Sequence, residues 1–262
     1  MELSIIILTM NSRKYIHVLL NSIKDCEIDK KAEVLVVDAD STDLTRCCVK
    51  GFNFPRVINV GKVSKGKARN IGIKESHGNV IAFLDSDTEV LPGWYESLEK
   101  SMKTCDIVAG YSPDPSRKDI GRVPILINGC DISYPTCNIA YKREIFEKIK
   151  TGFVEIQRIP EDCEFHYRCI KAGYIIDYNP RMKVFHHQKF SRFGFSKQAF
   201  WNGEARYELN KWYPELKNAH QHGLSLDNIV RMGFGFLGFT IGRFLGKKNK
   251  IGSRYAKKTN SR

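Results

Sequence analysis

Residues 80–87 read Val80-Ile81-Ala82-Phe83-Leu84-Asp85-Ser86-Asp87, and residues 34–43 read Val34-Leu35-Val36-Val37-Asp38-Ala39-Asp40-Ser41-Thr42-Asp43. In both stretches a short apolar run ends in acids and turn-forming residues, which is typical of a buried strand in a parallel sheet. Open α/β sheets bind ligands just beyond the carboxyl ends of such strands. Because clustered carboxylates repel one another unless a cation or a hydrogen-bonding ligand offsets their charge, the two stretches predict a divalent metal and a phosphorylated ligand.

Around these stretches, apolar runs alternate with segments of helical spacing. The expected strands are Ser4–Leu8, Val34–Val37, Arg56–Val60, Asn79–Leu84, Asn138–Tyr141, Ile175–Asp177 and Lys183–His186. The expected helices contain Ile16–Ile23, open at Ser41 or Thr42, at Lys65, at Pro92 and at Arg143, and cover Glu161–Ala172 and Ser196–Leu209. Residues 111–129 hold three prolines and predict a surface loop. The alternation predicts an α/β fold with a mostly parallel sheet flanked by helices.

The net charge of +13 is carried mostly by the last part of the sequence. Residues 228–262 contain nine Lys or Arg and no Asp or Glu, which leaves a net charge of +4 for residues 1–227. Within this tail, Met232–Gly242 is uncharged but well short of the roughly 20 residues that span a bilayer. A short apolar segment followed by Lys247-Lys248-Asn249-Lys250 predicts an interfacial anchor on an anionic cytoplasmic leaflet. The alternative is a terminal helix docked on the domain, followed by a basic tail.

Eight cysteines occur without a CxxC pair, at spacings that match no zinc template. The first apolar run, Leu3–Leu8, has six residues and follows Glu2, unlike a secretory signal. We therefore expect reduced thiols and a cytoplasmic protein, peripheral at the cytoplasmic face of the membrane if the tail binds there.

The Asp85-Ser86-Asp87 segment is the most specific motif. One carboxylate could bind a divalent cation, while the other meets a ribose hydroxyl or a metal-bound water. Mg²⁺ and Mn²⁺ both favour such oxygen ligands together with substrate phosphates. A polar turn after a strand is the alternative. His186 or His187 could complete the metal shell, or both could simply lie at a strand edge.

Two further groups of charged residues have a functional and a structural interpretation. Arg69, with Lys65 and Lys67, could hold a diphosphate, because guanidinium pairs with phosphate bidentately. A solvated helix face is the alternative, and we expect it for Lys65. Glu161 and Asp162 begin a helix, where acids also favour the helix dipole.

Six segments occur in an order typical of one enzyme family: Ser4–Asn11, Val36–Asp43, Gly66–Gly72, Phe83–Asp87, Pro160–Asp162 and Val184–His186. Together they resemble the inverting family-2 glycosyltransferases, which have the GT-A fold and bind nucleotide sugars. The resemblance implies a catalytic domain over residues 1–227. Its Rossmann-like nucleotide-sugar half would cover about 1–110 and its acceptor half about 111–227, before the apolar and basic helical tail 228–262.

The resemblance also implies roles for single residues on the donor side. Thr9 and Asn11, in the opening strand and turn, would belong to the nucleotide-sugar site. Asp38 would contact the nucleobase or the ribose, and Asp40 would help shape the nucleotide pocket. Arg69 would lie near the nucleotide or the diphosphate.

For the metal and the base, the resemblance implies a second set of roles. Asp85 would bind ribose or metal, Asp87 would be a ligand of Mg²⁺ or Mn²⁺, and His186 fits the family's metal-site histidine better than His187. Asp162 would be the general base that accepts the proton of the acceptor hydroxyl. In-line attack from the opposite face, with the departing phosphates neutralised by cations, would invert the anomeric centre.

On the acceptor side, the interpretation includes Glu161 and Trp201, with core packing as the alternative for Trp201. The segment Gln198-Ala199-Phe200-Trp201 is only loosely similar to the QxxRW motif of processive synthases and lacks its arginine. We therefore expect transfer of one sugar, with UDP the donor nucleotide that the family favours. The expected acceptor carries a hydroxyl, and it would be lipid-linked if the tail binds a membrane. Ala39 and Asp40 depart from the family's common Asp-Gly, which affects the nucleotide contacts.

Two other functions are alternatives to this one. A nucleotidyltransferase would usually need a glycine-rich phosphate loop after the first strand, and Thr9–Arg13 contains no glycine. A non-catalytic adaptor, binding a membrane or a nucleic acid through the basic tail, would leave the three acidic clusters unexplained. We therefore expect an enzyme and no nucleic-acid partner.

Overall fold

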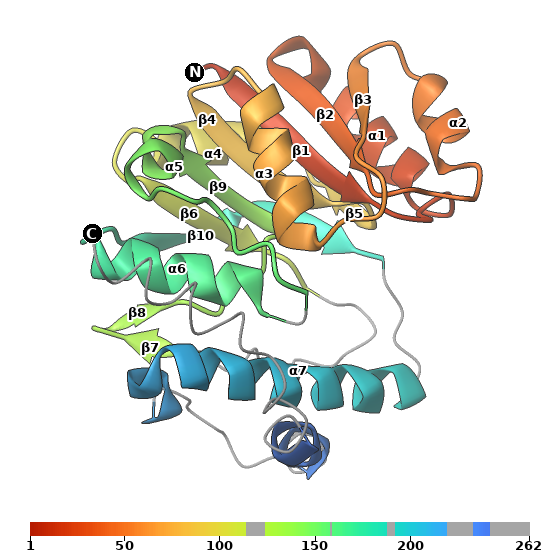
Figure 1. Cartoon of the computed structure of the whole chain (residues 1–262). Coiled ribbons are helices and arrows are strands. Elements are labelled where there is room, and N and C mark those ends of the chain that lie inside the picture. Colours follow the sequence, from red (N-terminus) through yellow and green to blue (C-terminus); the bar gives the residue numbers. More distant parts are fainter. Residues whose placement is uncertain (114–123, 158, 188–191, 219–232, 242–262) are drawn as a thin grey trace. The chain divides into compact units, whose positions relative to one another are not determined.

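The computed structural model describes residues 1–113, 124–157, 159–187, 192–218 and 233–241 (Figure 1). The chain divides into two compact units. The first comprises Met1–Asp119, Tyr134–Ile156 and Glu161–Lys189, and the second comprises Ile120–Ser133, Gln157–Pro160 and Phe190–Arg262. The first unit contains every acid and histidine of the predicted donor and metal sites.

An eight-stranded sheet forms the centre of the first unit, in the order β3-β2-β1-β4-β9-β6-β10-β5. Its strands are β1 (Leu3–Thr9), β2 (Ala32–Asp38), β3 (Pro55–Asn59), β4 (Val80–Asp85), β5 (Thr88–Val90), β6 (Ile107–Tyr111), β9 (Asn138–Lys142) and β10 (Ile176–His186). The neighbours β3-β2-β1-β4 are mutually parallel, as are β6 and β10. Strand β9 is antiparallel to β4 and β6, and β5 is antiparallel to β10. The prediction of a mostly parallel sheet in an α/β fold is confirmed.

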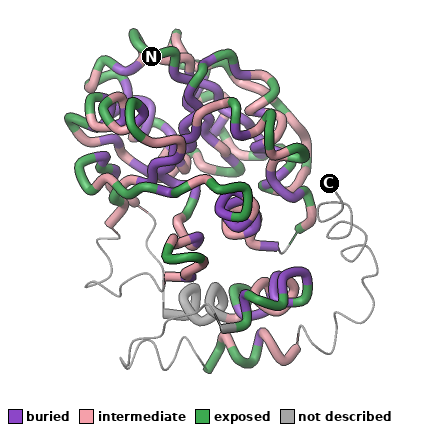
Figure 2. The backbone as a smooth tube through the Cα atoms, turned by 90° about the vertical axis from the view of Figure 1, so that its left-hand side faces the viewer, coloured by how far each residue is buried: buried purple, intermediate pink, exposed green. Residues whose placement is uncertain are grey.

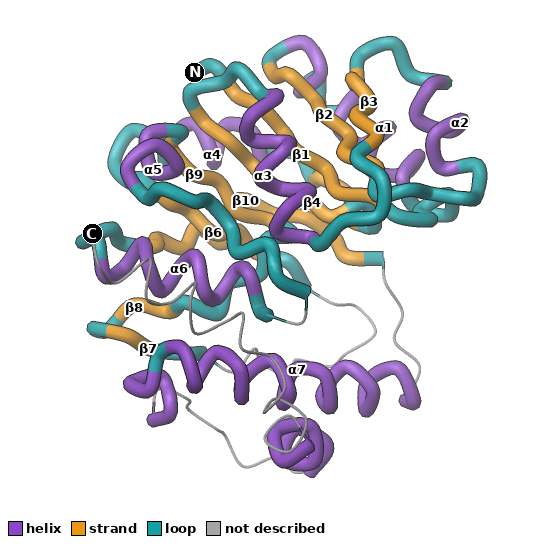
Figure 3. Tube along the Cα trace, in the orientation of Figure 1, coloured by secondary structure: helices purple, strands orange, loops and turns teal. Residues whose placement is uncertain are grey.

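Helices cover both faces of this sheet because successive residues of each buried strand point to opposite sides (Figure 3). On one face α1 (Ile16–Asp25) and α4 (Trp94–Ser101) pack against alternate residues of β1, β2 and β4, such as Ile5, Val36 and Ala82. The other face carries α3 (Lys65–Glu75) and α6 (Glu161–Lys171). Figure 2 shows the buried residues of this unit gathered in its interior. The short helices α2 (Thr45–Lys50), α5 (Glu144–Lys148) and η1 (Ile28–Lys30) complete the unit.

Helix α3 lies unusually close to its neighbours because two of its residues are glycines. A Cβ atom on Gly72 would lie 2.6 Å from Cγ2 of Ile6 in β1. A Cβ atom on Gly66 would lie 1.9 Å from the carbonyl oxygen of Val154. The N-cap of α3 is Ser64, whose Oγ accepts a hydrogen bond from the Lys67 amide at 3.2 Å. The first turn of α3 is thus fixed against the segment that precedes α6.

The second unit contains a β-hairpin and helices. Strands β7 (Leu126–Ile127) and β8 (Cys130–Asp131) are joined by Asn128 and Gly129, both at positive φ, as a two-residue hairpin turn requires. Helix α7 (Arg192–Trp212) is followed by η2 (Pro214–Asn218) and by a helix over residues 233–241. The last helix packs on α7 through glycines: a Cβ on Gly238 would meet the carbonyl oxygen of Phe200 at 1.9 Å.

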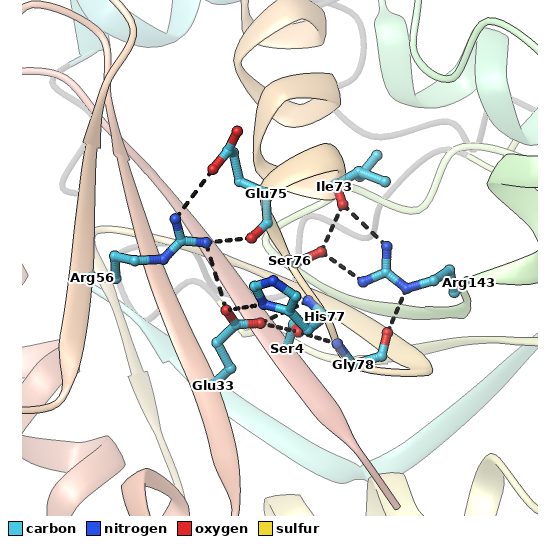
Figure 4. Close-up of polar contacts among 9 residues, drawn as sticks. All are labelled: Ser4, Glu33, Arg56, Ile73, Glu75, Ser76, His77, Gly78 and Arg143. Atoms are coloured by element: carbon cyan, nitrogen blue, oxygen red, sulfur yellow. Dashed lines mark hydrogen bonds and ion pairs between the residues drawn. The ribbon is translucent and has the colours of Figure 1, made fainter.

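A polar network closes the amino-terminal edge of the sheet, opposite the edge that carries the acids (Figure 4). The Glu33 carboxylate accepts hydrogen bonds from Ser4 Oγ (2.6 Å) and the His77 amide (2.9 Å), and Nη2 of Arg56 lies 3.6 Å from it. Arg143 donates to the carbonyls of Gly78 (2.7 Å) and of Ile73 (3.1 Å), the latter near the end of α3. This network fixes where β4 begins relative to β1 and β2.

The structure differs from the sequence-based expectation at one functional loop. The helix expected at Ser41 or Thr42 begins at Thr45, because the amides that would open it are bound elsewhere. The Ser41 amide donates to Asp38 Oδ1 (2.9 Å), and the Thr42 amide donates to Asn11 Oδ1 (2.8 Å). Residues 39–44 are therefore a loop wrapped around the Asn11 side chain.

Other differences concern strands. Ile175–Asp177 and Lys183–His186 are parts of the single strand β10, whose register shifts between Asn179 and Lys183. Strands β5 and β6 were not expected. Residues 126–131 form a hairpin that begins in the expected loop 111–129, of which 114–123 lie outside the described residues.

None of the helices that the structure describes is both long and apolar enough to cross a bilayer. Within the predicted tail, residues 233–241 are helical, while the basic segment from 242 onward lies outside the described residues.

Candidate functional site

The carboxyl ends of β1, β2 and β4 bring the predicted acids to one edge of the sheet. Thr9 pairs with Asp38 at the ends of β1 and β2, and Leu8 pairs with Asp85 at the end of β4. Asp87 follows in the turn between β4 and β5, where Ser86 Oγ lies 2.7 Å from Ser12 Oγ. His186 is the last residue of β10. Because strand register fixes these positions, the edge is assembled by the sheet itself.

Asp85, Asp87 and His186 form a group that could hold a metal ion. Each offers a ligand atom, and these atoms lie within 4.8 Å of one another. His186 Nε2 lies 3.1 Å from Asp87 Oδ1, whereas His187 Nε2 lies 2.7 Å from Glu89 Oε2. The structure therefore brings His186, and not His187, to the two carboxylates. Two carboxylates and one imidazole suit Mn²⁺, and the carboxylates suit Mg²⁺.

The electrostatics of this group favour a bound cation. Burial raises the pKa of the Asp85 carboxyl, and the attraction of Arg69 and Lys65 does not fully offset it. Burial also acts to raise the pKa of Asp87, but the hydrogen bond and charge of His186 outweigh it and lower that pKa. The charge of Asp87 also acts to raise the pKa of Asp85, a repulsion that a divalent cation would relieve.

Asp38 presents a buried carboxylate oxygen that is not satisfied. Its side chain is fully buried, and Oδ1 accepts from the Ser41 amide at 2.9 Å and lies 3.8 Å from Arg46 Nε. Within the described part of the chain, Asp38 Oδ2 has no hydrogen-bond partner, and neither has Thr9 Oγ1. A ligand N–H or O–H at this edge would supply the missing donor.

Asn11 and Asp40 shape the loop next to Asp38. Both have positive φ, 55° for Asn11 and 67° for Asp40. The Asn11 side chain binds the Thr42 amide, and its own amide donates to Ser41 Oγ at 2.9 Å. Asn11 therefore holds the loop in place, whereas Asp40 lies exposed at its tip.

Arg69 has partners that the sequence did not reveal. Its guanidinium is buried, donates to Glu161 Oε1 and to Thr136 Oγ1, and lies 5.4 Å from the ring centre of Phe153. The expected location near the diphosphate stays a prediction. Thr136 lies between β8 and β9, and it carried no sequence signal for this contact.

Glu161 and Asp162 are the first two residues of α6. Asp162 Oδ1 accepts from the Cys163 amide at 2.8 Å. Burial, followed by the neighbouring Glu161 charge, raises the pKa of Asp162 to about 6. Glu161 forms an ion pair with Arg69, and its expected acceptor role stays a prediction. Trp201 belongs to α7 in the second unit, and its acceptor role stays a prediction.

The interaction of Lys65 with the site carboxyls is what sequence reasoning missed. It was expected to be a solvated lysine, and it is exposed in the first turn of α3. Its ammonium nevertheless acts to lower the pKa of four site carboxyls, those of Asp85, Asp87, Glu161 and Asp162. Lys65 therefore faces the acidic edge while remaining open to solvent.

The model of the family "Glycosyl transferase family 2" matches residues 4–155, more than half of the chain. Among curated proteins, the chain is similar to the poly(ribitol-phosphate) β-N-acetylglucosaminyltransferase TarS of Staphylococcus aureus, with 38% identity over 93 residues, 33% of this chain and 16% of TarS. It is also similar to the pre-mycofactocin glycosyltransferase of Mycobacterium tuberculosis, with 28% identity over 192 residues, 64% of this chain and 39% of that protein. The chain thus spans well under half the length of either relative.

Solved structures share the fold. The structure of Staphylococcus aureus TarS with UDP-GlcNAc superposes with a TM-score of 0.66 at 20% identity, covering 98% of this chain and 78% of the other. The mannosyltransferase PcManGT of Pyrobaculum calidifontis, with GDP-Man and Mn²⁺, gives a TM-score of 0.63 at 15% identity, covering 99% and 79%. Glucosyl-3-phosphoglycerate synthase of Mycobacterium tuberculosis, with Mn²⁺, UDP and phosphoglyceric acid, gives 0.60 at 17% identity, covering 80% and 78%. These similarities identify the sheet and its helices as GT-A-like.

Proposed function

This chain belongs to glycosyl transferase family 2, and from that membership we propose that it transfers one sugar from a UDP-sugar to a hydroxyl acceptor, with inversion at the anomeric carbon. The structural relatives solved with UDP-GlcNAc, with UDP or with Mn²⁺ support a UDP-linked donor and a divalent cation. The enzyme class follows from the family, whereas the donor, the acceptor and the stereochemistry are what the proposal adds.

The observation that carries the proposal is the convergence of Asp85, Asp87 and His186, with ligand atoms within 4.8 Å, beside the unsatisfied carboxylate of Asp38. Asp85, Asp87 and His186 would hold Mn²⁺ or Mg²⁺, which when bound neutralises charge on the departing diphosphate. Asp38 Oδ2 would accept a hydrogen bond from the nucleobase or the ribose. The exposed Lys65 ammonium would meet the diphosphate as a second cation.

Asp162 would be the general base of the transfer. With a pKa of about 6, its carboxylate is ionised at neutral pH and is more basic than an ordinary aspartate. It would take the proton of the acceptor hydroxyl as that oxygen attacks the anomeric carbon opposite the leaving diphosphate. We expect kcat/KM to fall about tenfold per pH unit below about pH 6, since only the ionised base is active. This fall in kcat/KM at low pH is the acid limb of the pH profile. An acid limb that is unchanged in Asp162→Asn would contradict this assignment.

The test of the whole proposal is calorimetric titration with UDP, GDP and their common sugar conjugates, with and without Mn²⁺. Binding should depend on the metal, disappear in Asp87→Ala and survive in Asp162→Ala. Absence of nucleotide binding under every metal condition would refute a sugar-nucleotide enzyme. Nucleotide binding that the Asp87→Ala change leaves intact would refute the metal site alone.

We further propose that the tail attaches the protein peripherally to an anionic cytoplasmic membrane surface, where a lipid-linked acceptor would be within reach. Helix 233–241 packs closely on α7 through Gly238 and through Gly203 of α7, and it leaves Phe236 70% and Leu237 48% exposed. Nine basic residues and no acid occur in 228–262. Exposed apolar side chains beside clustered cations are the combination that binds anionic bilayer surfaces.

A further inference from the structure

The Arg69–Glu161 pair lies directly beside the proposed base, and both side chains are engaged with protein. Their side chains are only 5% and 14% exposed. Arg69 donates one hydrogen bond to Glu161 and another to Thr136, and its guanidinium lies over the rings of Phe83 and Phe153 at 5.9 and 5.4 Å. A guanidinium held on this many sides has little freedom to follow a substrate.

The backbone on the Arg69 side of the pair is anchored independently. Ser64 Oγ donates to the Glu155 carbonyl at 2.8 Å. Six residues further along, the Asn70 side chain donates to the Phe153 carbonyl and accepts from the Phe153 amide, both at 2.8 Å. Helix α3 is therefore fixed to residues 153–155, and Arg69 extends from it to the first residue of α6.

We propose that Arg69 and Glu161 are positioning residues for the base: their ion pair fixes the first turn of α6, orients the Asp162 carboxylate toward the acceptor, and leaves the Glu161 charge beside it. This inference rests on the proposed function, in which Asp162 is the base. In this inference Glu161 holds the first turn of α6 and does not bind the acceptor. Arg69 pairs with Glu161 and not with the diphosphate.

The charges around Asp162 support these separate roles for Glu161 and Asp162. Arg69 lowers the pKa of Glu161 against the effect of burial, so Glu161 is ionised, and that charge adds to burial in raising the pKa of Asp162. Arg69 and Lys65 of α3 oppose the rise. Among the described residues, Cys137 and Tyr141 also interact with Asp162; burial raises the pKa of both, which are therefore neutral at pH 7. One cation paired with the first of two adjacent acids thus separates them into an ionised partner and a base.

The test compares Glu161→Gln with Glu164→Gln. Glu164 is a matched control because it forms a buried ion pair with Arg168 on the same helix, with hydrogen bonds of 2.9 and 2.8 Å. The probes are UDP affinity by calorimetry and UDP release from UDP-GlcNAc, or from whichever UDP-sugar binds, with water as acceptor. We expect Glu161→Gln to retain UDP affinity within about twofold, to lose about tenfold or more in kcat and to move the acid limb to lower pH. Glu164→Gln should leave the acid limb in place.

Variants of Arg69 should shift the acid limb in the opposite direction. Arg69→Met removes the cation that opposes the rise, so the acid limb should move to higher pH, and Arg69→Lys should restore it in part. The double variant Arg69→Met/Glu161→Gln buries no unpaired charge and keeps the comparison available if a single variant fails to fold. Loss of UDP affinity in Arg69→Lys or Glu161→Gln would instead assign the pair to the donor and overturn the inference.

A direct titration separates this inference from the proposed function. The carboxyl ¹³C signal of Asp162, identified by its absence in Asp162→Asn, should titrate at lower pH in Glu161→Gln than in the unmodified protein. An unchanged midpoint would overturn the inference even if the enzyme is active. Full UDP release by Asp162→Asn would refute the base assignment, whatever the titration gives.

Discussion

At the scale of single residues, Asp38 has one satisfied and one unsatisfied carboxylate oxygen, and we expect a ligand to bind at the unsatisfied one. Asp38 has one oxygen bound by the Ser41 amide and another buried without a partner among the described residues. Leaving a buried acceptor unpaired costs about 1–3 kcal/mol. A nucleotide that donates a hydrogen bond to this oxygen would recover that free energy on binding. The unpaired oxygen thus lowers the stability of the ligand-free fold and strengthens binding of the nucleotide.

Asp38→Asn tests this interpretation. The amide NH₂ in place of Oδ2 would present a donor to the ligand's donor, so we expect UDP affinity to fall by about 10–100-fold, on the scale of an unpaired hydrogen bond. Thermal stability should be unchanged or raised, because a buried charge is removed. Calorimetry with UDP and a melting curve measure the two effects. Wild-type affinity with a lower melting temperature would mean that Asp38 serves the loop and not the nucleotide.

Lys65→Met tests the cation that faces the acids. Because its ammonium is exposed yet interacts with four site carboxyls, we expect it to attract the diphosphate. UDP affinity should fall about tenfold, in the range of one charge-assisted hydrogen bond, while uridine affinity stays within about twofold. Lys67→Met is the matched control, since Lys67 is exposed in the same turn. Equal losses in both lysine variants would indicate a general effect of net charge.

At the scale of elements, apolar runs and helical spacing predicted the strands and helices that depend on local sequence. The apolar runs before Asp38 and Asp85 predicted β2 and β4, and apolar residues at helical spacing predicted α1 and α6. The order of the motifs predicted the Asp85, Asp87 and His186 group, whose members lie within reach of one another. Strand β5 is three residues long and could not be distinguished from the turn that precedes it.

What the sequence could not predict are contacts made across long separations. The pairing of Arg69 with Glu161 joins residues 92 positions apart and exists only because α3 and α6 cover the same face of the sheet. The late start of α2 has the same origin. Asn11, from the first turn, takes up the amides of Thr42 and Asp43, and no local preference of residues 41–44 encodes that.

The network at the amino-terminal edge makes a prediction at this scale. Hydrogen bonds from Ser4 and His77 lower the pKa of Glu33 below 4.5 although burial acts to raise it, so its ionised form stabilises the folded chain. That contribution is present above about pH 4.5 and is lost as the pH falls through the lowered pKa. Glu33→Gln should lower the melting temperature at pH 7 by about 2–4 °C, a loss of about 1 kcal/mol.

The pH dependence and a control complete that test. The difference between Glu33→Gln and the unmodified protein should shrink as the pH falls below about 4.5. Glu75→Gln removes only a half-exposed partner of Arg56, and it should shift the melting temperature by about 1 °C at most. A difference at Glu33 that persists unchanged at low pH would show that the charge is not its cause.

At the scale of the whole molecule, charge and apolar surface are distributed unevenly along the chain. The nearly balanced residues 1–227 contain the proposed donor site, and residues 228–262 carry most of the net charge. If the tail serves attachment and the body serves chemistry, the two activities should be separable. Removing residues 242–262 should then leave metal-dependent UDP binding intact within about twofold, whereas an adaptor built around the tail would lose its only ligand.

Vesicle sedimentation tests the attachment itself. The full chain should bind vesicles containing phosphatidylglycerol more tightly than pure phosphatidylcholine vesicles, and less tightly as salt rises, because each basic residue near the surface contributes about 1 kcal/mol. Phe236→Ala/Leu237→Ala should weaken binding by about tenfold or more, since two apolar side chains no longer enter the interface. Leu44→Ala removes a side chain as exposed as Leu237 but in the first unit, and it should change nothing. Equal affinity for both kinds of vesicle would exclude an electrostatic anchor, and equal losses at Leu44 and Phe236 would exclude helix 233–241 as the part that touches the lipid.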